Sequence, residues 1–196
     1  MAFARPKKRE PVGEAGLFEY AVGVLARRMR TVRDLRRLMK ARAEEGEAGE
    51  RAMDAVVARL KELNYLSDTR FAADYTRLRK ENEKHGRRRV QQDLMQKGVQ
   101  KDLVATTLAK AYDDVDEVAL AREYIARKRM KQPSGPDAQK QTVRVMGRMM
   151  RAGFSSSAIF KVLREWHLPE EAMASIEEGV SDSDSYAERD EDLPEF

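Results

Sequence analysis

The chain has 196 residues, of which 37% are charged and 41% are hydrophobic, and its formal net charge at pH 7 is +4. It contains no cysteine, which excludes disulfides and thiolate metal sites. No apolar run approaches the roughly 20 residues of a membrane span, and the first residues lack the apolar stretch of a signal peptide. We therefore expect a cytoplasmic protein without membrane contact.

The charge is distributed unevenly along the chain. Residues 177–196 contain nine acids and one base, a net charge of −8, which leaves 37 bases and 25 acids, or +12, for residues 1–176. We expect residues 179–196 to form a disordered acidic tail, because they have too little apolar surface to offset the entropy lost on ordering. The basic body favours a polyanionic partner or an acidic protein surface.

Apolar residues recur at helical spacing through most of the body, and no segment alternates as a strand would. The predicted order is a flexible basic arm at 1–13, helices at about 14–28, 31–43, 50–63, 69–84 and 87–97, a helix with Asp102 in its first turn, one that begins near 116, and helices at 137–151, 155–167 and 169–178. Residues 44–50 are predicted to form a loop. The predicted N-terminal caps are Thr31, Ser67 or Asp68, and Ser155.

Apolar residues of the predicted helices recur at a spacing of 55 residues, which we call the repeat step. Two columns carry it: Leu35, Val90 and Val145, and then Met39, Leu94 and Met149. The apolar face of the next helix recurs in three sets, the second 51 residues after the first and the third 55 residues after the second: Ala52, Met53, Val56, Val57 and Leu60; Leu103, Val104, Thr107, Leu108 and Ala111; Ala158, Ile159, Val162, Leu163 and Trp166. A repeated amphipathic pattern indicates stacked modules with an extended surface. We predict an all-α fold of three tandem three-helix units in an elongated array, at residues 14–66, 67–113 and 114–178.

Some single side chains also have predicted positions. The inward face of the helix at 69–84 is predicted to be Phe71, Ala72, Tyr75 and Leu78. Met95 is predicted to lie on or beside an apolar stripe, and Trp166 to be a buried anchor. Three glycines (Gly86, Gly98 and Gly153) are predicted to mark helix ends.

Groups that could perform catalysis are scarce. The two histidines, His85 and His167, have no second histidine at helical spacing, so we expect no metal site. The glycine-rich and nucleophile motifs of nucleotide-binding and hydrolytic enzymes are absent. We therefore expect no catalytic residues, no cofactor and no enzymatic activity.

Arginines concentrate in the second helix of each predicted unit, and they are the candidate contact residues: Arg33, Arg36 and Arg37; Arg87, Arg88 and Arg89; Arg144, Arg148 and Arg151. Like charges at this spacing destabilise a helix by a few tenths of a kcal/mol per pair. Since the pattern occurs in all three units, we interpret it as a discontinuous basic ridge along an anionic groove, with a purely solubilising role as the alternative. Such contacts bind nucleic acid without reading its sequence.

Three segments resemble motifs of the RecX family, the regulators of the bacterial recombinase RecA. Asn64-Tyr-Leu-Ser-Asp-Thr-Arg-Phe-Ala72 is similar to that family's GYLDDxxFA joint. Gly86-Arg-Arg-Arg-Val90, followed by Asp93-Leu94 and Lys97-Gly98-Val99, is similar to its GxxRI…EL…KGI segment. Arg151-Ala-Gly-Phe154 resembles its RRGF element, and the whole resemblance covers about residues 15–175.

The resemblance implies a helical modulator that binds RecA filaments on single-stranded DNA, in DNA repair, recombination and the SOS response. It would lodge in the filament groove, inhibit ATP hydrolysis and strand exchange, and favour disassembly. Contact with single-stranded DNA would be independent of sequence and either direct or through the filament. We expect the chain to act as a monomer.

Two questions stay open at the level of sequence. The alternative function is a DNA-binding transcription or architectural protein with helix-turn-helix-like units, for which Gln91 and Gln92 could read bases. The acidic tail could be an inert solubiliser, or it could fold over the basic ridge and lower the affinity for DNA.

Overall fold

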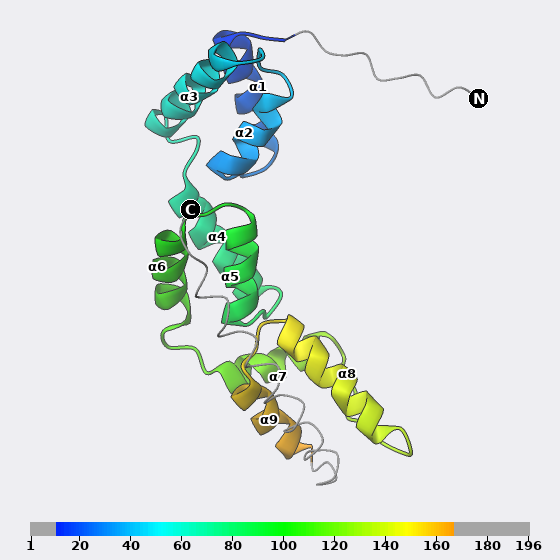
Figure 1. The fold of residues 1–196 in the computed structure, drawn as a ribbon. Coiled ribbons are helices and arrows are strands. Elements are labelled where there is room, and N and C mark those ends of the chain that lie inside the picture. The colour runs from blue at the N-terminus through cyan, green and yellow to red at the C-terminus, as the bar shows by residue number, and fades with distance from the viewer. Residues whose placement is uncertain (1–10, 167–196) are drawn as a thin grey trace, which may run out of the picture. The chain divides into compact units, whose positions relative to one another are not determined.

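Figure 1 shows the computed structural model of the chain, in which residues 11–166 are described. These residues form α-helices and no strand. The helices are α1 (Glu14–Arg27), α2 (Val32–Lys40), α3 (Glu47–Glu62), α4 (Asp68–Glu81), α5 (Arg87–Gln96), α6 (Lys101–Tyr112), α7 (Glu117–Arg127), α8 (Ala138–Arg151) and α9 (Ser156–Glu165). The predicted all-α class is confirmed. The predicted helix at 169–178, the acidic tail and most of the basic arm lie outside the described residues.

The helices belong to two compact units. Unit 1 comprises Met1–Arg77 and Gln91–Ala111, and unit 2 comprises Leu78–Val90 and Tyr112–Phe196. The boundary passes through α4 and α5, so each of these helices contributes residues to both units. The division into three repeats at 14–66, 67–113 and 114–178 stays a prediction. Among residues 11–166, no helix has both the length and the apolar character needed to cross a bilayer.

The core of unit 1 forms where α1, α2 and α3 pack together (Figure 1). Buried apolar side chains line the facing stripes: Leu17 and Ala21 of α1, Leu35 and Met39 of α2, and Met53, Val56, Val57 and Leu60 of α3. The spacing of the α3 residues places them on one face of the helix. Burying each large aliphatic side chain contributes about 1.5–3 kcal/mol, so this stripe explains why a highly charged sequence folds here.

A joint between α2 and the ends of α4 and α5 completes unit 1. Buried Thr31 caps α2 by accepting a hydrogen bond from the Asp34 amide at 3.1 Å, and its hydroxyl donates to the carbonyl oxygen of Lys97 at 2.7 Å. Asp68 accepts from the Val32 amide at 2.9 Å. The Val32 amide at the start of α2 and the Lys97 carbonyl after α5 thus gain hydrogen-bond partners that their own helices cannot supply. We call this contact the Thr31 joint.

The cap of α4 is settled by the same arrangement. Ser67 accepts a hydrogen bond from the amide of Arg70 at 3.2 Å, which is the geometry of an N-cap. Because Ser67 fills that role, the carboxylate of Asp68 is available to α2. Of the two caps that the sequence allowed, Ser67 is the one observed.

In unit 2, α7 packs against α9, and α8 packs against α9 (Figure 1). The buried core includes Leu120, Tyr124, Met149, Phe154, Ile159 and Leu163. The rings of Tyr124 and Phe154 meet edge to face, with centroids 5.5 Å apart. Trp166 packs against this core but is only half-buried, so the predicted fully buried anchor is wrong in degree.

Polar contacts fix α9 against α7. Glu117 accepts hydrogen bonds from the amide of Ser155 at 2.7 Å and from its hydroxyl at 2.6 Å. Ser155 in turn caps α9 by accepting from the Ala158 amide, as predicted. At the other end, Arg122 donates to both carboxylate oxygens of Glu165, at 3.0 and 2.5 Å, and these hydrogen bonds lower the pKa of Glu165.

One residue that was predicted to face inward is exposed. Leu78 is 45% exposed, and the face of α4 instead buries Phe71, Ala72 and Thr76. Tyr75 is half-buried, and its hydroxyl donates to Asp93 of α5 at 2.9 Å. Met95, which was predicted to lie on or beside an apolar stripe, is 45% exposed and adjoins the fully buried Leu94, so it lies beside the stripe.

The predicted loop at 44–50 is shorter than expected, because α3 begins at Glu47. Gly46 has φ +81°, a conformation that glycine adopts readily, and it ends the loop. Gly49 is buried in the first turn of α3, where a Cβ atom would overlap the carbonyl oxygen of Glu44. Gly49 is therefore a helix residue and not the predicted loop residue, and its missing side chain allows the loop backbone to pass close to the helix.

We predict opposite effects for two glycine-to-alanine substitutions in helices of unit 1. Gly49→Ala should lower the free energy of unfolding by about 1–3 kcal/mol, because a backbone atom of Glu44 cannot move away cheaply. Gly23→Ala, in the exposed middle of α1 with no atom within 4 Å of the new Cβ, should raise it by about 0.5–1 kcal/mol. Urea unfolding of both variants tests this, and equal shifts would contradict the close packing at Gly49.

Candidate nucleic-acid interface

The predicted contact arginines divide between the two units. Arg33, Arg36 and Arg37 lie on α2 in unit 1, whereas the other six lie in unit 2. The latter are Arg87, Arg88 and Arg89 in the first turn of α5, and Arg144, Arg148 and Arg151 on α8.

The α2 arginines already have partners within unit 1. The Arg33 guanidinium donates to the carbonyl oxygen of Gln96 and occupies the space that a side chain at Gly98 would need. It is therefore part of the Thr31 joint. Gly98 has φ +78° and ends α5, as predicted, so both its conformation and its neighbour require glycine.

Arg36 and Arg37 pair with acids. Arg36 forms ion pairs with Asp54 and, at 2.8 Å, with Glu50, and the hydrogen bond to Asp54 raises the pKa of the guanidinium. Arg37 lies 3.3 Å from Asp34 on its own helix. The side chain of Arg37 is 75% exposed, so this pair contributes little to stability, and Arg37 is the most available of the three.

The start of α5 lies directly against the turn between α8 and α9 in unit 2. The Gly86 amide donates to the carbonyl oxygen of Ala152 at 2.8 Å. A Cβ atom at Gly86 would overlap the Gly153 carbonyl oxygen, and one at Gly153 would overlap the Arg89 backbone nitrogen. Gly153 has φ +91° and ends α8. We call this contact the glycine joint.

The glycine joint brings two predicted arginine clusters together. Arg87 directly follows Gly86, and Arg151 directly precedes Ala152, so the hydrogen bond between Gly86 and Ala152 places their backbones side by side. Arg148 and Arg144 lie on the same face of α8, about 5 and 10 Å further along the helix axis. We call these six residues the basic cluster: Arg87, Arg88, Arg89, Arg144, Arg148 and Arg151.

The basic cluster is exposed and has few acids nearby. All six arginines are exposed, and α8 contains four bases and no acid. Within residues 11–166, Arg87, Arg88, Arg144, Arg148 and Arg151 have no carboxylate at ion-pair distance. Like charges held close together raise the local positive potential, which attracts anions. The arrangement suits the binding of several phosphates.

The turn that leads into the basic cluster is held in place from α6 and α7. The hydroxyl of Tyr112 donates to the carbonyl oxygen of His85 at 2.8 Å, and burial raises the pKa of Tyr112. Lys84 forms an ion pair with Glu123 at 2.6 Å. These contacts fix the backbone just before Gly86, so the first turn of α5 is positioned from both sides.

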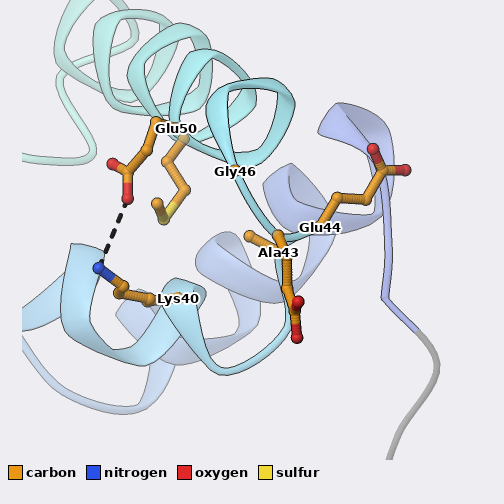
Figure 2. Close-up of a pocket in the computed structure, with 7 residues that line it drawn as sticks. Lys40, Ala43, Glu44, Gly46 and Glu50 are labelled. Atoms are coloured by element: carbon orange, nitrogen blue, oxygen red, sulfur yellow. Dashed lines mark ion pairs between the residues drawn. The ribbon is translucent and has the colours of Figure 1, made fainter.

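A hollow of about 320 Å³ lies elsewhere, between the end of α2 and the start of α3 (Figure 2). Lys40, Met53 and three glutamates, Glu44, Glu45 and Glu50, contribute to its lining. Figure 2 shows the ion pair between Lys40 and Glu50, 3.6 Å long, across this space. Because acids outnumber bases there, the hollow does not suit a phosphate. Among the described residues, no group of three or more potential metal ligands occurs.

Known proteins share both the sequence and the fold. A model of the second three-helix domain of RecX matches residues 67–108. The regulatory protein RecX of Deinococcus radiodurans is 31% identical over 163 residues, which cover 82% of this chain and 72% of that protein. The chain belongs to the RecX family. The regulatory protein RecX of Mycobacterium ulcerans is 27% identical over 163 residues, 83% of this chain and 91% of that protein.

The fold of RecX proteins agrees with the helices described above. The crystal structure of RecX from Lactobacillus salivarius has a TM-score of 0.58 at 18% identity, and the match covers 80% of this chain and 97% of that one. At this identity the likeness shows the fold alone. The family predicted from the motifs at 64–72, 86–99 and 151–154 is confirmed.

Sequence reasoning missed the two joints. It predicts only helix boundaries at Gly86 and Gly153 and a contact residue at Arg33, although all three make tertiary contacts. A signal was present in the repeat, because the repeat step separates Thr31 from Gly86 and also Lys97 from Ala152. The donors and acceptors of the two joints thus follow the same spacing as the core residues.

We predict that Gly86→Ala opens the glycine joint. The new Cβ would overlap backbone, which can only be relieved by moving α5 away from the α8–α9 turn, at a cost of about 1–3 kcal/mol. Hydrogen exchange of the amide at position 86 should become faster. Gly147→Ala is the control, because its Cβ would meet only the flexible tip of Arg151 at 3.3 Å. Unchanged exchange in Gly86→Ala would contradict the joint.

We also predict that removing an arginine of the Thr31 joint lowers the stability of the protein more than removing an arginine of the basic cluster. Arg33→Ala should lower the free energy of unfolding by about 0.5–1.5 kcal/mol, because it removes a hydrogen bond to Gln96 and the packing on Gly98. Arg148→Ala should change it by less than about 0.5 kcal/mol. Denaturant unfolding measures both, and a larger loss for Arg148→Ala would reverse the assignment.

Proposed function

We propose that this RecX-family chain is a non-enzymatic modulator of the RecA recombinase. It binds RecA filaments on single-stranded DNA, inhibits ATP hydrolysis and strand exchange, and favours filament disassembly in DNA repair and recombination. It acts as a monomer in the cytoplasm. The basic cluster of unit 2 is the main contact surface, with Arg37 of unit 1 as a further contact.

The observation that carries this proposal is the concentration of exposed arginines at the glycine joint. The six arginines lie on α5 and α8, and the start of α5 is held in place by contacts with the α8–α9 turn and with Tyr112. Phosphate binding by such groups releases counterions and gives affinity that falls with salt. Fork-shaped guanidinium groups also pair well with carboxylates on a protein surface. Both kinds of contact are available on a filament of protein and DNA.

Arg33 and Arg36 have a different role in this proposal. Their guanidinium groups form internal contacts with Gln96, Glu50 and Asp54. A partner would have to break those contacts before binding. We therefore assign them to the stability of unit 1.

The alternative, a sequence-specific duplex binder, is supported only by the exposure of Gln91 and Gln92 on α5. Glutamine side chains can read adenine in the major groove. A preference of the chain for one duplex sequence over others by more than about tenfold would favour this alternative.

RecA-driven ATP hydrolysis on single-stranded DNA tests the proposal. The wild-type chain should inhibit hydrolysis at stoichiometric or lower amounts, and the triple variant R144A/R148A/R151A should lose most of that inhibition. The control variant R51A/R70A/R77A removes the same charge from exposed positions of unit 1 and should inhibit normally. Absence of inhibition by the wild-type chain would contradict the proposed function. An equal loss of inhibition in both variants would contradict the assignment of the basic cluster as the contact surface.

The salt dependence of binding to single-stranded DNA gives a second readout. For a single strand, each lost phosphate contact reduces the slope of log affinity against log salt by about 0.7. The triple variant should therefore show a slope shallower by about 2, while the control variant keeps the wild-type slope.

A further inference from the structure

The basic cluster gathers exposed arginines from α5 and α8, and it differs in this from the paired arginines of the chain. Arg36 pairs with Glu50 and Asp54, and Arg122 pairs with Glu165. Within residues 11–166, five of the six arginines in the basic cluster have no carboxylate at ion-pair distance. The structure around them thus holds positive charge together without compensation, and like charges at this spacing repel each other.

The largest group of acids in the sequence lies in residues 177–196, which carry a net charge of −8. The described part of the chain ends at Trp166, directly after α9, and α9 packs against α8 within unit 2. Residue 177 is eleven residues beyond Trp166. An extended chain of that many residues spans up to about 38 Å. Since α8 is only about 21 Å long, the acids can reach its whole arginine face.

We propose that the acidic segment 177–196 binds the basic cluster of unit 2 and competes there with external polyanions. The inference rests on the proposed function only in taking the basic cluster as the binding surface for DNA or filament. Charge complementarity selects this occupant, because the segment carries a net charge of −8 and five arginines of the cluster have no acid partner within residues 11–166. An attached segment also acts at an effective concentration in the millimolar range. Arg36 of unit 1 is a poor alternative target, because acids already occupy it.

The consequence is a regulated surface. A carboxylate segment that is weakly bound and always present lowers the affinity for short or isolated DNA strands. A filament offers many phosphates and protein carboxylates at once, so it displaces the segment. The competition is electrostatic and weakens as salt shortens the Debye length from about 10 Å at 0.1 M.

A spin label on the acidic segment tests the contact in the full chain, without DNA or RecA. Because the protein has no cysteine, Ser185→Cys gives a single attachment site. At low salt, the label should broaden the amide signals of residues 87–89 and 144–151 and leave those of α1 unchanged. The broadening should disappear in R144A/R148A/R151A. Broadening that is absent, or that is equal in both units, would overturn the inference.

Binding of a fluorescent oligo(dT) strand tests the competition. The variant D182N/D184N/E188Q/D190N/E191Q/D192N should bind about tenfold more tightly than the wild-type chain at about 50 mM salt, and about twofold more tightly above about 200 mM. The matched control, E19Q/E44Q/E45Q/E62Q/D113N/D114N, makes the same change in net charge at exposed positions of the body. It should change the affinity less than twofold.

The two proposals fail in different ways. If the control tightens binding as much as the tail variant does, the effect is one of net charge, and segment binding is refuted. If the spin label reports contact with the basic cluster but neither chain inhibits RecA, the inference stands and the proposed function fails. If RecA is inhibited and the label reports no contact, the proposed function stands and the inference fails.

Discussion

The rest of the structure depends on one contact that is made twice. In unit 1, the hydroxyl of Thr31 donates to the carbonyl oxygen of Lys97. In unit 2, the amide of Gly86 donates to the carbonyl oxygen of Ala152. The repeat step separates the two donors and also the two acceptors, and both acceptors belong to the turn that ends a helix. Carbonyls at a helix end have no partner in their own helix. Each joint satisfies one of them with the start of a helix that lies earlier in the chain.

The carbonyl that lies one repeat step before that of Lys97 also accepts a hydrogen bond, but from a different kind of donor. Arg42 lies one repeat step before Lys97, and its carbonyl oxygen accepts a hydrogen bond from the amide of Val12 at 2.9 Å. Val12 precedes α1, so the residues that lead into this helix supply the partner of the Arg42 carbonyl.

The two joints also give the arginines different roles. At the Thr31 joint, Arg33 is used for the contact itself and fills the space above Gly98. At the glycine joint, backbone meets backbone through Gly86 and Gly153, and the six arginines of the basic cluster are exposed. The same step in the sequence thus produces a structural arginine in one unit and an available cluster in the other.

The sequence by itself determined the all-α class, the helices and most of the core, because periodic burial and end signals act over a few neighbouring residues. Leu35, Met39, Leu94 and Met149 are fully buried as their spacing predicted. The tertiary structure decided which arginines are available, why Gly49 is buried, and why Leu78 faces solvent while Thr76 does not. Those outcomes depend on backbones that approach each other from distant parts of the chain, such as Gly86 and Gly153. Local spacing carries no information about that approach, because a glycine that ends a helix and one that admits another helix have the same sequence pattern.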